Sequence, residues 1–507
     1  MGDIFTHLGQ GFGVALTPLN LLLCFVGAVV GSLIGVLPGL GPMTGVAILV
    51  PFTFVLKLPP ESSLILLAGI YYGAMYGGST TSILLNVPGE TASVVTTLDG
   101  YEMAKKGQAG PALAVSAIGS FFAGTISVVG LMLFAPLLAE WAIRFGPAEY
   151  FALMVFAFST VSTLAGKNLA KALISTVFGL MLAVVGMDPG SGVTRYTFGQ
   201  MKLYDGMDFL VVTIGLFAVS EALNLLEETH LGQDAAAKMG KVYISFKQFM
   251  FSLGAIIRGS LLGFFIGVLP GAGASIASFI SYTVEKRVSD KNKTFGKGDI
   301  RGVAAPESAN NAAAGGAMIP LLTLGVPGSG TTAVLLGTLM GMNITPGPLM
   351  FDKHPHVVWG LIASMYIGNV MLLILNLPLV GLFVRILLIP RWILIPAVTA
   401  ISFVGVYSVN NAAIDIILMA GFGVVGYVMR KLDFPLAPVI LGLVLGPLME
   451  VNLRRAMSIS GGDWTYLWSS PLSISLWVLA GVSLFAPMLF AKLREIKKQA
   501  ISGEEEM

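Results

Sequence analysis

The sequence predicts an all-α, polytopic membrane protein built from two related halves. Hydrophobic residues make up 55% of the 507 residues and charged residues only 11%, against roughly 25% charged in an average soluble domain. Apolar stretches near the length of about 20 residues that crosses a bilayer as a helix recur along the chain. A glycine- and proline-rich motif also occurs twice, both times in strongly apolar surroundings.

The apolar stretches predict about 10 to 12 membrane passes, together with broken or re-entrant segments. The first 17 residues contain no Lys or Arg, so the basic flank of a cleavable signal peptide is missing and the first stretch is expected to remain as a span. The clearest candidate spans are Leu19–Leu37, Ala112–Leu138, Tyr150–Leu164, Leu169–Met187, Phe209–Leu223, Val357–Val380, Ile393–Tyr407, Ile414–Val428 and Ser473–Phe490.

The repeated motif is Gly35–Gly41, which returns almost unchanged as Gly267–Gly273. A Val-Pro-Gly follows each copy, at Val87–Gly89 and at Val326–Gly328. The first motif repeats after 232 residues and the second after 239 residues, so the order of the motifs is the same in both halves. A duplicated membrane chain with Gly/Pro interruptions at matching places is typical of secondary transporters.

Basic residues in the loops predict that the two halves cross the membrane in opposite directions. The loop 286–301 contains six Lys or Arg, whereas its counterpart 57–61 contains only Lys57. Conversely, Lys105 and Lys106 lie in a loop whose counterpart, Gly341–Gly347, is uncharged. Because cytoplasmic loops are rich in Lys and Arg, this alternation indicates inverted repeats, with the C-terminus in the cytoplasm.

Polar segments divide the chain into a first membrane repeat (1–225), a polar linker (226–252), a second membrane repeat (253–450) and a terminal membrane anchor with a cytoplasmic tail (451–507). Within the second repeat, Ile256 to Val284 is too long for one straight span and too short for two. Basic residues flank both ends. This combination predicts a re-entrant hairpin with Pro270-Gly271 at its tip.

The two Leu-Pro-Gly segments cannot continue a helix, because proline lacks an N–H donor and the glycines allow positive φ. Each break frees a half-helix N-terminus, whose N–H groups attract anions. A single break would be explained by a packing kink, but four breaks in matched pairs favour a binding centre. The expected solute contacts here are Pro38, Gly39, Gly41, Pro270, Gly271 and Gly273.

Hydroxyl and amide side chains surround the two Val-Pro-Gly segments. Their oxygens and the freed carbonyls suit a small, hard cation such as Na⁺, and the donors among them suit a carboxylate. The alternative is that Ser and Thr cap half-helices or bond back to their own helix. The predicted substrate contacts are Ser79, Thr80, Thr81, Pro327, Gly328 and Ser329, and the predicted cation ligands are Asn86, Thr331 and Thr332.

Glu307, Asn310 and Asn311 share one helix face through their i+3 and i+4 spacing. Polar groups near membrane depth are costly and suggest a function, so Asn310 and Asn311 are predicted to be further cation ligands. Glu307 is left open between a functional carboxylate and an acid that stabilises a helix N-terminus.

Several kinds of site are excluded. The single cysteine, Cys24, permits no intrachain disulfide and no Cys-based metal centre. The sequence has no phosphate loop and no His-Glu-x-x-His zinc helix, and the four histidines are expected outside the spans. The acidic residues of the apolar stretches look too scattered for a carboxylate pair. The chain is therefore not expected to be an enzyme, to bind nucleic acid, or to use a cofactor other than a coupling ion, Na⁺ or H⁺.

At these motifs the chain resembles the large membrane subunit of the tripartite tricarboxylate transporters, the TctA-like family. The residues that carry the resemblance are the twin Gly-Val-Leu-Pro-Gly segments, Ala305–Ala312 and Gly325–Ser329, and the similarity covers roughly residues 15 to 450. The resemblance implies a multi-pass protein of the bacterial inner membrane that imports di- or tricarboxylates with Na⁺ or H⁺.

The resemblance also implies two partners besides the lipid bilayer and the carboxylate. One is a small, TctB-like membrane subunit of about four spans, and the other is a periplasmic, TctC-like solute-binding protein that delivers the substrate. The alternatives are a channel and an unrelated ion-coupled carrier for another small organic anion. A channel would need a continuous polar stripe, whereas the polar groups here are confined to the breaks.

Overall fold

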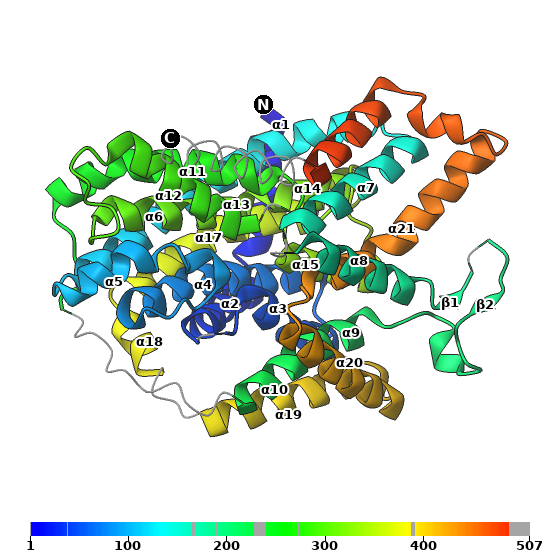
Figure 1. Cartoon of the computed structure of the whole chain (residues 1–507), viewed down its shortest axis with the longest axis horizontal. Helices are drawn as coiled ribbons and strands as arrows, with labels where there is room; N and C mark the ends of the chain where they lie inside the picture. The colour runs from blue at the N-terminus through cyan, green and yellow to red at the C-terminus, as the bar shows by residue number, and fades with distance from the viewer. Residues whose placement is uncertain are drawn as a thin grey trace, which may run out of the picture. The chain divides into compact units, whose positions relative to one another are not determined.

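The computed structural model describes residues 2–37, 39–164, 168–188, 190–227, 240–271, 273–386 and 391–485. Figure 1 shows that these residues are almost entirely helical, and their only strands are β1 (Gly186–Met187) and β2 (Thr194–Arg195). The prediction of an all-α membrane protein is confirmed. The chain forms two compact units: Met1–Ile143 with Met207–Leu432, and Arg144–Gly206 with Asp433–Met507. Each unit is described by itself.

Seven helices of the described chain are long and apolar enough to cross a membrane. Five shorter apolar helices accompany them, and residues 486–490 of the last predicted stretch lie outside the described residues. The seven are α2 (Pro18–Val36), α6 (Ala109–Ala142), the segment Phe209–Glu227, α11 (Phe246–Val268), α17 (Pro355–Asn376), α20 (Ala413–Lys431) and α21 (Ala437–Ile459). The shorter ones are α3 (Pro42–Val55), α8 (Leu169–Ala183), α15 (Gly330–Gly341) and the segments Ile395–Asn410, within α19 (Arg391–Asn410), and Pro471–Phe485. Five of the seven long helices overlap predicted stretches, whereas α11 and α21 were not among the clearest candidates, and the predicted stretch Leu169–Met187 contains only the shorter helix α8.

The remaining elements connect these spans or interrupt them. The α-helices are α1 (Gly2–Ala15), α4 (Pro60–Leu85), α5 (Thr97–Lys105), α7 (Pro147–Leu164), α9 (Phe209–Ile214), α10 (Ser220–Glu227), α12 (Gly273–Ser289), α13 (Ile300–Gly316), α14 (Met318–Leu324), α16 (Met350–Lys353) and α18 (Val380–Ile386). The 3₁₀-helices are η1 (Thr91–Ser93), η2 (Met201–Leu203) and η4 (Trp464–Trp468), and η3 (Gly215–Val219) is a π-helical turn between α9 and α10.

Close helix contacts through glycine build the core of the larger unit. In α2, a Cβ added at Gly27, Gly31 or Gly35 would lie 2.2 to 2.4 Å from a carbonyl oxygen of α4. In α11, a Cβ added at Gly259, Gly263 or Gly267 would lie 2.2 to 2.5 Å from a carbonyl oxygen of α13. Small residues at four-residue spacing let membrane helices approach this closely, so each triplet defines one helix pair.

The two helix pairs are equivalent residue by residue. The glycines of α11 follow those of α2 by 232 residues, the offset of the first sequence motif. Their carbonyl partners follow by 239 residues, the offset of the second motif: Ile70, which faces Gly31, corresponds to Ala309, which faces Gly263. The duplicated sequence therefore folds into two copies of the same contact.

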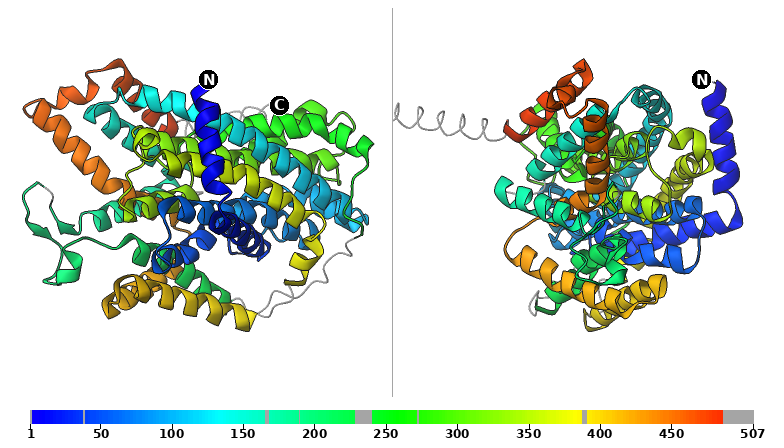
Figure 2. Two further views of the ribbon diagram at one scale, coloured as in Figure 1. Left: turned by 180° about the vertical axis from the view of Figure 1, so that it is seen from behind. Right: turned by 90° about the vertical axis from the view of Figure 1, so that its right-hand side faces the viewer.

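Each half also packs a long helix onto the helix pair of the other half. Helix α6 of the first half packs on α11 and α13, and α17 of the second half packs on α2 and α4. Figure 2 shows α1, in dark blue at the N-terminus, beside α17. Between these helices the ring of His7 stacks on that of Trp359, with the ring centroids 5.6 Å apart. These contacts between helices of different halves hold the larger unit together.

The hairpin of the second half differs from the sequence-based prediction in its length. Ser245 begins α11 with a capping box to Gln248, so the helix starts at Phe246 and not near Ile256. Helix α11 then has 23 residues and α12 has 17 and ends at Ser289, so the expected short hairpin between Ile256 and Val284 was wrong at both boundaries. The capping signal, Ser followed by Gln three residues later, is local and lay in the segment assigned to the linker.

In the smaller unit, α8 packs against α21 so closely that a Cβ on Gly179 would lie 2.1 Å from the carbonyl oxygen of Val439. A polar cluster follows at the β1–β2 hairpin, where Asp188 accepts hydrogen bonds from the N–H groups of Ser191 and Gly190 and pairs with Arg454 at 2.8 Å. These backbone hydrogen bonds hold the pKa of Asp188 below its usual value.

The two basic loops of the larger unit lie side by side, because Lys106 donates a hydrogen bond from Nζ to the carbonyl oxygen of Lys297. Next to the uncharged loop, a Cβ on Gly341 would lie 3.2 Å from the ring of Phe54 in the last turn of α3. The contact between the two basic loops is what repeats of opposite direction require, and the topology itself stays a prediction.

This arrangement makes topology testable by thiol labelling. In a Cys24→Ser background, Lys57→Cys and Lys291→Cys should react with a membrane-impermeant maleimide from opposite sides, because cytoplasmic loops carry the basic residues. Lys105→Cys serves as the control and should react from the same side as Lys291→Cys. Labelling of Lys57→Cys and Lys291→Cys from one side would contradict the opposite orientation of the halves.

Candidate functional site

The two Leu-Pro-Gly motifs end their helices as predicted. Helix α2 ends at Val36 and α3 begins at Pro42, while α11 ends at Val268 and α12 begins at Gly273. Gly39 and Gly271 have φ of +91° and +78°, a backbone conformation that favours glycine. Pro38 lies outside the described residues.

The two Val-Pro-Gly motifs form a second matched pair of breaks. Asn86 follows α4 with φ of +58° and Gly325 follows α14 with φ of +67°, so both helices end on a left-handed residue. After each motif comes a capping box: Glu90 pairs with Ser93, and Ser329 pairs with Thr332. The left-handed conformation shows that Asn86 ends helix α4. The sequence alone did not distinguish this structural role from that of a cation ligand.

The breaks of the two halves meet. The Thr91 hydroxyl, just after the second break of the first half, lies 2.8 Å from the hydroxyl of Ser275 in the first turn of α12. Tyr71 Oη lies 3.3 Å from Ser329 Oγ at the start of α15. A Cβ on Gly89 would lie 2.2 Å from the carbonyl oxygen of Gly35. The interruptions therefore form one polar centre inside the larger unit.

Glu307 is the most buried acid of this centre. It lies in α13 two turns after the first residue, Ile300, and its side chain is fully buried. The interpretation of Glu307 as a helix N-terminal acid is therefore wrong. Thr96 donates a hydrogen bond to Oε1, and Asn310 Nδ2 lies 3.3 Å from Oε2.

The predicted face of α13 forms as expected. Asn311 Nδ2 lies 2.6 Å from Asn310 Oδ1, 3.1 Å from the carbonyl oxygen of Glu307 and 2.7 Å from Ser120 Oγ. Its other atom, Oδ1, is buried and has no hydrogen-bond partner among the described residues. An unsatisfied buried acceptor is costly, so this oxygen is available to a cation.

Glu90 supplies a second buried carboxylate. It is 7% exposed, its Oε1 has no hydrogen-bond partner among the described residues, and the charge of Glu307 acts on it. The acids were expected to be too scattered for a carboxylate pair; folding nevertheless places two of them, from different halves, where the charge of one acts on the other. The signal in the sequence was positional: Glu90 directly follows a predicted break, at the place that Ser329 occupies in the second half.

The other predicted residues take different places. Ser79, Thr80 and Thr81 lie within the regular helix α4, where Ser79 bonds to the carbonyl oxygen of Tyr76 and Thr81 to that of Gly78. Thr331 and Thr332 are buried in the first turn of α15, and Thr332 bonds to Ser329. A Cβ on Gly41 or Gly273 would meet no atom within 4 Å, unlike one on Gly328, which would crowd Ala317. Pro270 lies in the turn between α11 and α12, and Pro327 in the turn before α15.

Sequence reasoning placed no guanidinium near the motifs, but the structure brings one close to the first tip. A Cβ on Gly39 would lie 2.9 Å from Oε1 of Glu221, and Glu221 pairs with Arg430. Thr96, Ser116, Ser120 and Tyr71 were also missed. No repeated motif in the sequence marks these hydroxyl residues.

The unpaired oxygen of Asn311 leads to a test of cation binding. Asn311→Ala should raise the Na⁺ concentration for half-maximal uptake about tenfold if one lost ligand is worth about 1.4 kcal/mol, and Asn310→Ala should act in the same direction. Asn452→Ala is the matched control, because Asn452 bonds to the carbonyl oxygen four residues earlier, as Asn311 does. Unchanged Na⁺ dependence in both variants would assign the amides to helix capping.

Comparison with known proteins places this centre in a family. The model described as "Tripartite tricarboxylate transporter TctA family" matches residues 21–441. A protein of Agrobacterium vitis, described as an uncharacterized 52.8 kDa protein in the TAR-I ttuC' 3' region, is 45% identical over 506 residues, 100% of both chains. An uncharacterized Agrobacterium vitis protein in the TAR-II ttuC' 3' region is 48% identical over 227 residues, 45% of this chain and 94% of that protein.

No solved structure matches the chain. The family model, however, spans both Leu-Pro-Gly breaks, both Val-Pro-Gly breaks, Glu90 and Glu307. The chain therefore belongs to the tripartite tricarboxylate transporter TctA family, and it is a transmembrane transport protein.

Proposed function

We propose that the chain is the large permease subunit of a solute-binding-protein-dependent secondary transporter, which imports di- or tricarboxylates by symport with Na⁺ or H⁺. It works in the bacterial inner membrane with its C-terminus in the cytoplasm. A small, TctB-like membrane subunit accompanies it, and a periplasmic, TctC-like receptor delivers the carboxylate. Membership in the TctA family supports this assignment.

One observation carries the cation-coupled mechanism: Glu307 is fully buried at the meeting point of the breaks, and no ion pair reaches it within the described part of the chain. A buried carboxylate is costly unless hydrogen bonds, a cation or a proton compensate its charge. The unpartnered oxygens of Glu90 and Asn311 supply further ligands. A coupling ion bound here would neutralise two neighbouring carboxylates at once.

The carboxylate substrate has a different set of contacts. Half-helix N-termini begin at α3, α12 and α15, next to the Gly39, Gly271 and Ser329 segments. Their N–H groups favour anions, and the Ser329 hydroxyl adds a donor. Two inverted repeats would present these breaks to opposite sides of the membrane in turn. The matched glycine contacts and the contact between the two basic loops support that repeat arrangement.

Uptake into proteoliposomes tests this function. The chain is reconstituted with its small membrane subunit, candidate receptors are supplied outside, and a panel of labelled carboxylates is offered under an inward Na⁺ gradient, an inward H⁺ gradient or neither. A carrier gives saturable uptake that requires the receptor and stops when the gradient is dissipated. Flux that does not saturate and continues without a cation gradient would favour a channel instead.

A further inference from the structure

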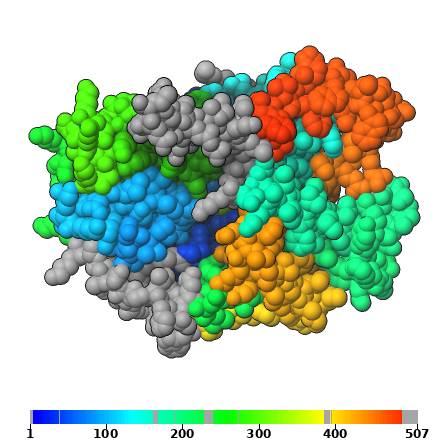
Figure 3. Space-filling model, viewed as in Figure 1, coloured from blue at the N-terminus to red at the C-terminus, as the bar shows by residue number. Residues whose placement is uncertain are grey.

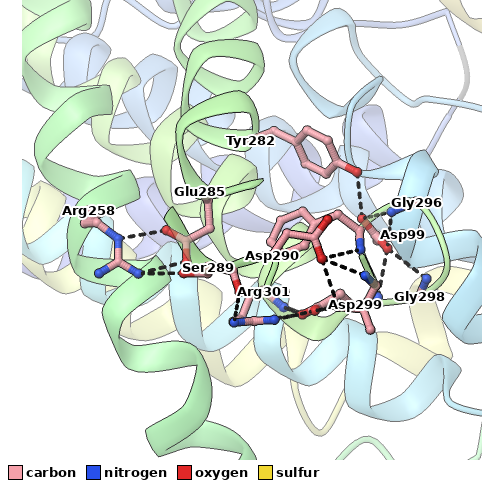
Figure 4. A network of polar contacts seen from close by, with 12 residues as sticks. Asp99, Arg258, Tyr282, Glu285, Ser289, Asp290, Gly296, Gly298, Asp299 and Arg301 are labelled. Carbon is pink, nitrogen blue, oxygen red and sulfur yellow. Dashed lines mark hydrogen bonds and ion pairs between the residues drawn. The ribbon is translucent and has the colours of Figure 1, made fainter. Parts of the chain in front are cut away.

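Asp99 is another buried carboxylate of the larger unit, and it differs from Glu90 because both of its oxygens have hydrogen-bond partners. It lies in α5, is fully buried, and accepts hydrogen bonds from four groups (Figure 4). The donors are Tyr282 Oη at 2.8 Å and the backbone N–H groups of Gly296, Gly298 and Asp299 at 2.9, 2.8 and 2.8 Å. Successive N–H groups that point at one anion form an anion-binding nest, and here the anion is the protein's own side chain.

The nest is the turn 296–299, which leads directly into α13. Asp299 caps that helix by accepting from the N–H of Arg301, and its carboxylate also binds the Arg301 guanidinium at 2.7 Å. Burial alone would raise the pKa of Asp299, but the hydrogen bonds from Arg301 and Thr294 outweigh it and leave the pKa below its usual value. The start of α13 is therefore fixed in place by charged hydrogen bonds.

Asp99 also touches the first turn of α13 itself. A Cβ on Gly302 would lie 2.1 Å from Asp99 Oδ2, so only a glycine lets the carboxylate reach the turn. In Figure 3 the surface of residues near 100, in light blue, lies beside the green surface of residues near 280 to 295. Asp99 thus fastens α5 of the first half to the beginning of α13 of the second half.

The contacts of Asp99 extend to Glu307 through both α5 and α13. Thr96, the residue that donates to Glu307 Oε1, is the N-cap of α5, and its carbonyl oxygen accepts from the N–H of Gly100, next to Asp99. Glu307 lies on α13, about two turns beyond the turn that Asp99 binds. One carboxylate therefore fixes both helices whose side chains, Thr96 and Glu307, form the short contact at the polar centre.

We infer that Asp99 is a positioning residue of the coupling centre: by binding the turn 296–299 it sets Thr96 against Glu307 and so determines how well the coupling cation is held. This inference rests on the proposed function. Asp99 does not touch the cation, and its effect passes through Thr96. Loss of Asp99 should weaken the cation dependence of transport more than it weakens the binding of the carboxylate.

A double-mutant cycle separates this role from simple anchoring of a loop. Asp99→Asn turns one acceptor oxygen into a donor that faces the donors of the nest, and Thr96→Val removes the hydroxyl that reaches Glu307. Each single variant should raise the Na⁺ or H⁺ concentration for half-maximal uptake about tenfold, as expected for one lost hydrogen bond to a charged group. If Asp99 acts through Thr96, the double variant should be no worse than Thr96→Val alone.

Glu285→Gln is the matched control. It breaks the bidentate contact between Arg258 and Glu285, 2.8 Å long, which lies in the same polar network and joins α11 to α12 without touching Asp99 (Figure 4). It should leave the cation half-saturation unchanged, both alone and in combination with Thr96→Val. Cation-dependent thermal stabilisation of the purified protein gives a second readout that does not require transport.

The outcomes are distinct. If the parent protein shows no cation dependence, the proposed coupling fails, whatever Asp99 does. If the parent depends on a cation and Asp99→Asn keeps its half-saturation, or if the effects of Asp99→Asn and Thr96→Val add, Asp99 only anchors the loop and the inference is overturned. Should Asp99→Asn not fold, Tyr282→Phe removes one of the four donors and decides in the same way, with a smaller shift expected.

Discussion

Glu307→Gln should lower cation-driven accumulation of carboxylate at least about 100-fold, while substrate exchange across the membrane is retained. The change keeps the size of the side chain and the acceptor for Thr96, but it removes the negative charge at the meeting point of the breaks. Hydrogen bonds and contacts to a charged group contribute about 1.5 to 3 kcal/mol each, and 2.7 kcal/mol corresponds to about 100-fold. An amide can neither hold Na⁺ by charge nor release a proton.

Two measurements on the same vesicles separate coupling from substrate binding. Accumulation under an inward Na⁺ or H⁺ gradient reports coupling, and counterflow of labelled against unlabelled carboxylate without a gradient reports movement of the loaded carrier. Glu102→Gln is the control, because Glu102 pairs with the neighbouring Lys105 on α5 and is far more exposed. If Glu307→Gln accumulates substrate with the parent's cation dependence, Glu307 is a structural acid and the cation site lies elsewhere.

The positions of the apolar helices and of their breaks followed from the sequence, because they depend on local composition. A helix in lipid satisfies its own backbone hydrogen bonds, so apolar stretches such as Ala112–Leu138 coincide with α6, and both Leu-Pro-Gly motifs interrupt helices as proline and glycine require. The shared face of Glu307, Asn310 and Asn311 followed from helical spacing alone. The start of α11 at Phe246 was missed because a capping box outweighed the polar composition around it.

The composition of the site depends on contacts between the halves, and these leave no local pattern. Glu90 and Glu307 belong to different repeats, and the motif order did not reveal that folding brings their charges together. Thr96 and Asp99 are single polar residues whose roles come from the turn 296–299, which lies in the basic loop after α12. Sequence spacing predicts which residues share one face of a helix. It does not predict which other helix packs against that face.

The second large effect concerns the glycines that join the helix pairs. Gly31→Val and Gly263→Val should each abolish recovery of monodisperse protein from the membrane. A Cβ at these positions would lie 2.4 and 2.2 Å from the carbonyl oxygens of Ile70 and Ala309, against 3.4 to 4 Å for an ordinary contact. The helices would have to separate by more than 1 Å, and overpacking of this kind costs about 1 to 3 kcal/mol or more.

The measurement is size-exclusion chromatography of a fluorescent fusion, with the temperature at which half of the peak is lost. Gly421→Val is the matched control, because Gly421 lies in the candidate span α20 and a Cβ there would meet no atom within 4 Å. Parent-like melting of Gly263→Val would show that α11 and α13 do not pack this closely.

The comparison of the two glycine variants tests more than either does alone. Membrane helices associate through close packing and not through the hydrophobic effect, because lipid is as apolar as their side chains. The loss should therefore depend on the contact and not on the residues around it. Gly31 faces Ile70 on α4, whereas Gly263 faces Ala309 on α13 beside the polar Asn310. If the halves are equivalent modules, the two variants should lose stability to a similar degree, although the sequences around the two glycines differ. A large loss for one and none for the other would mean that only one helix pair holds the core, and that the second copy of the motif is kept for transport.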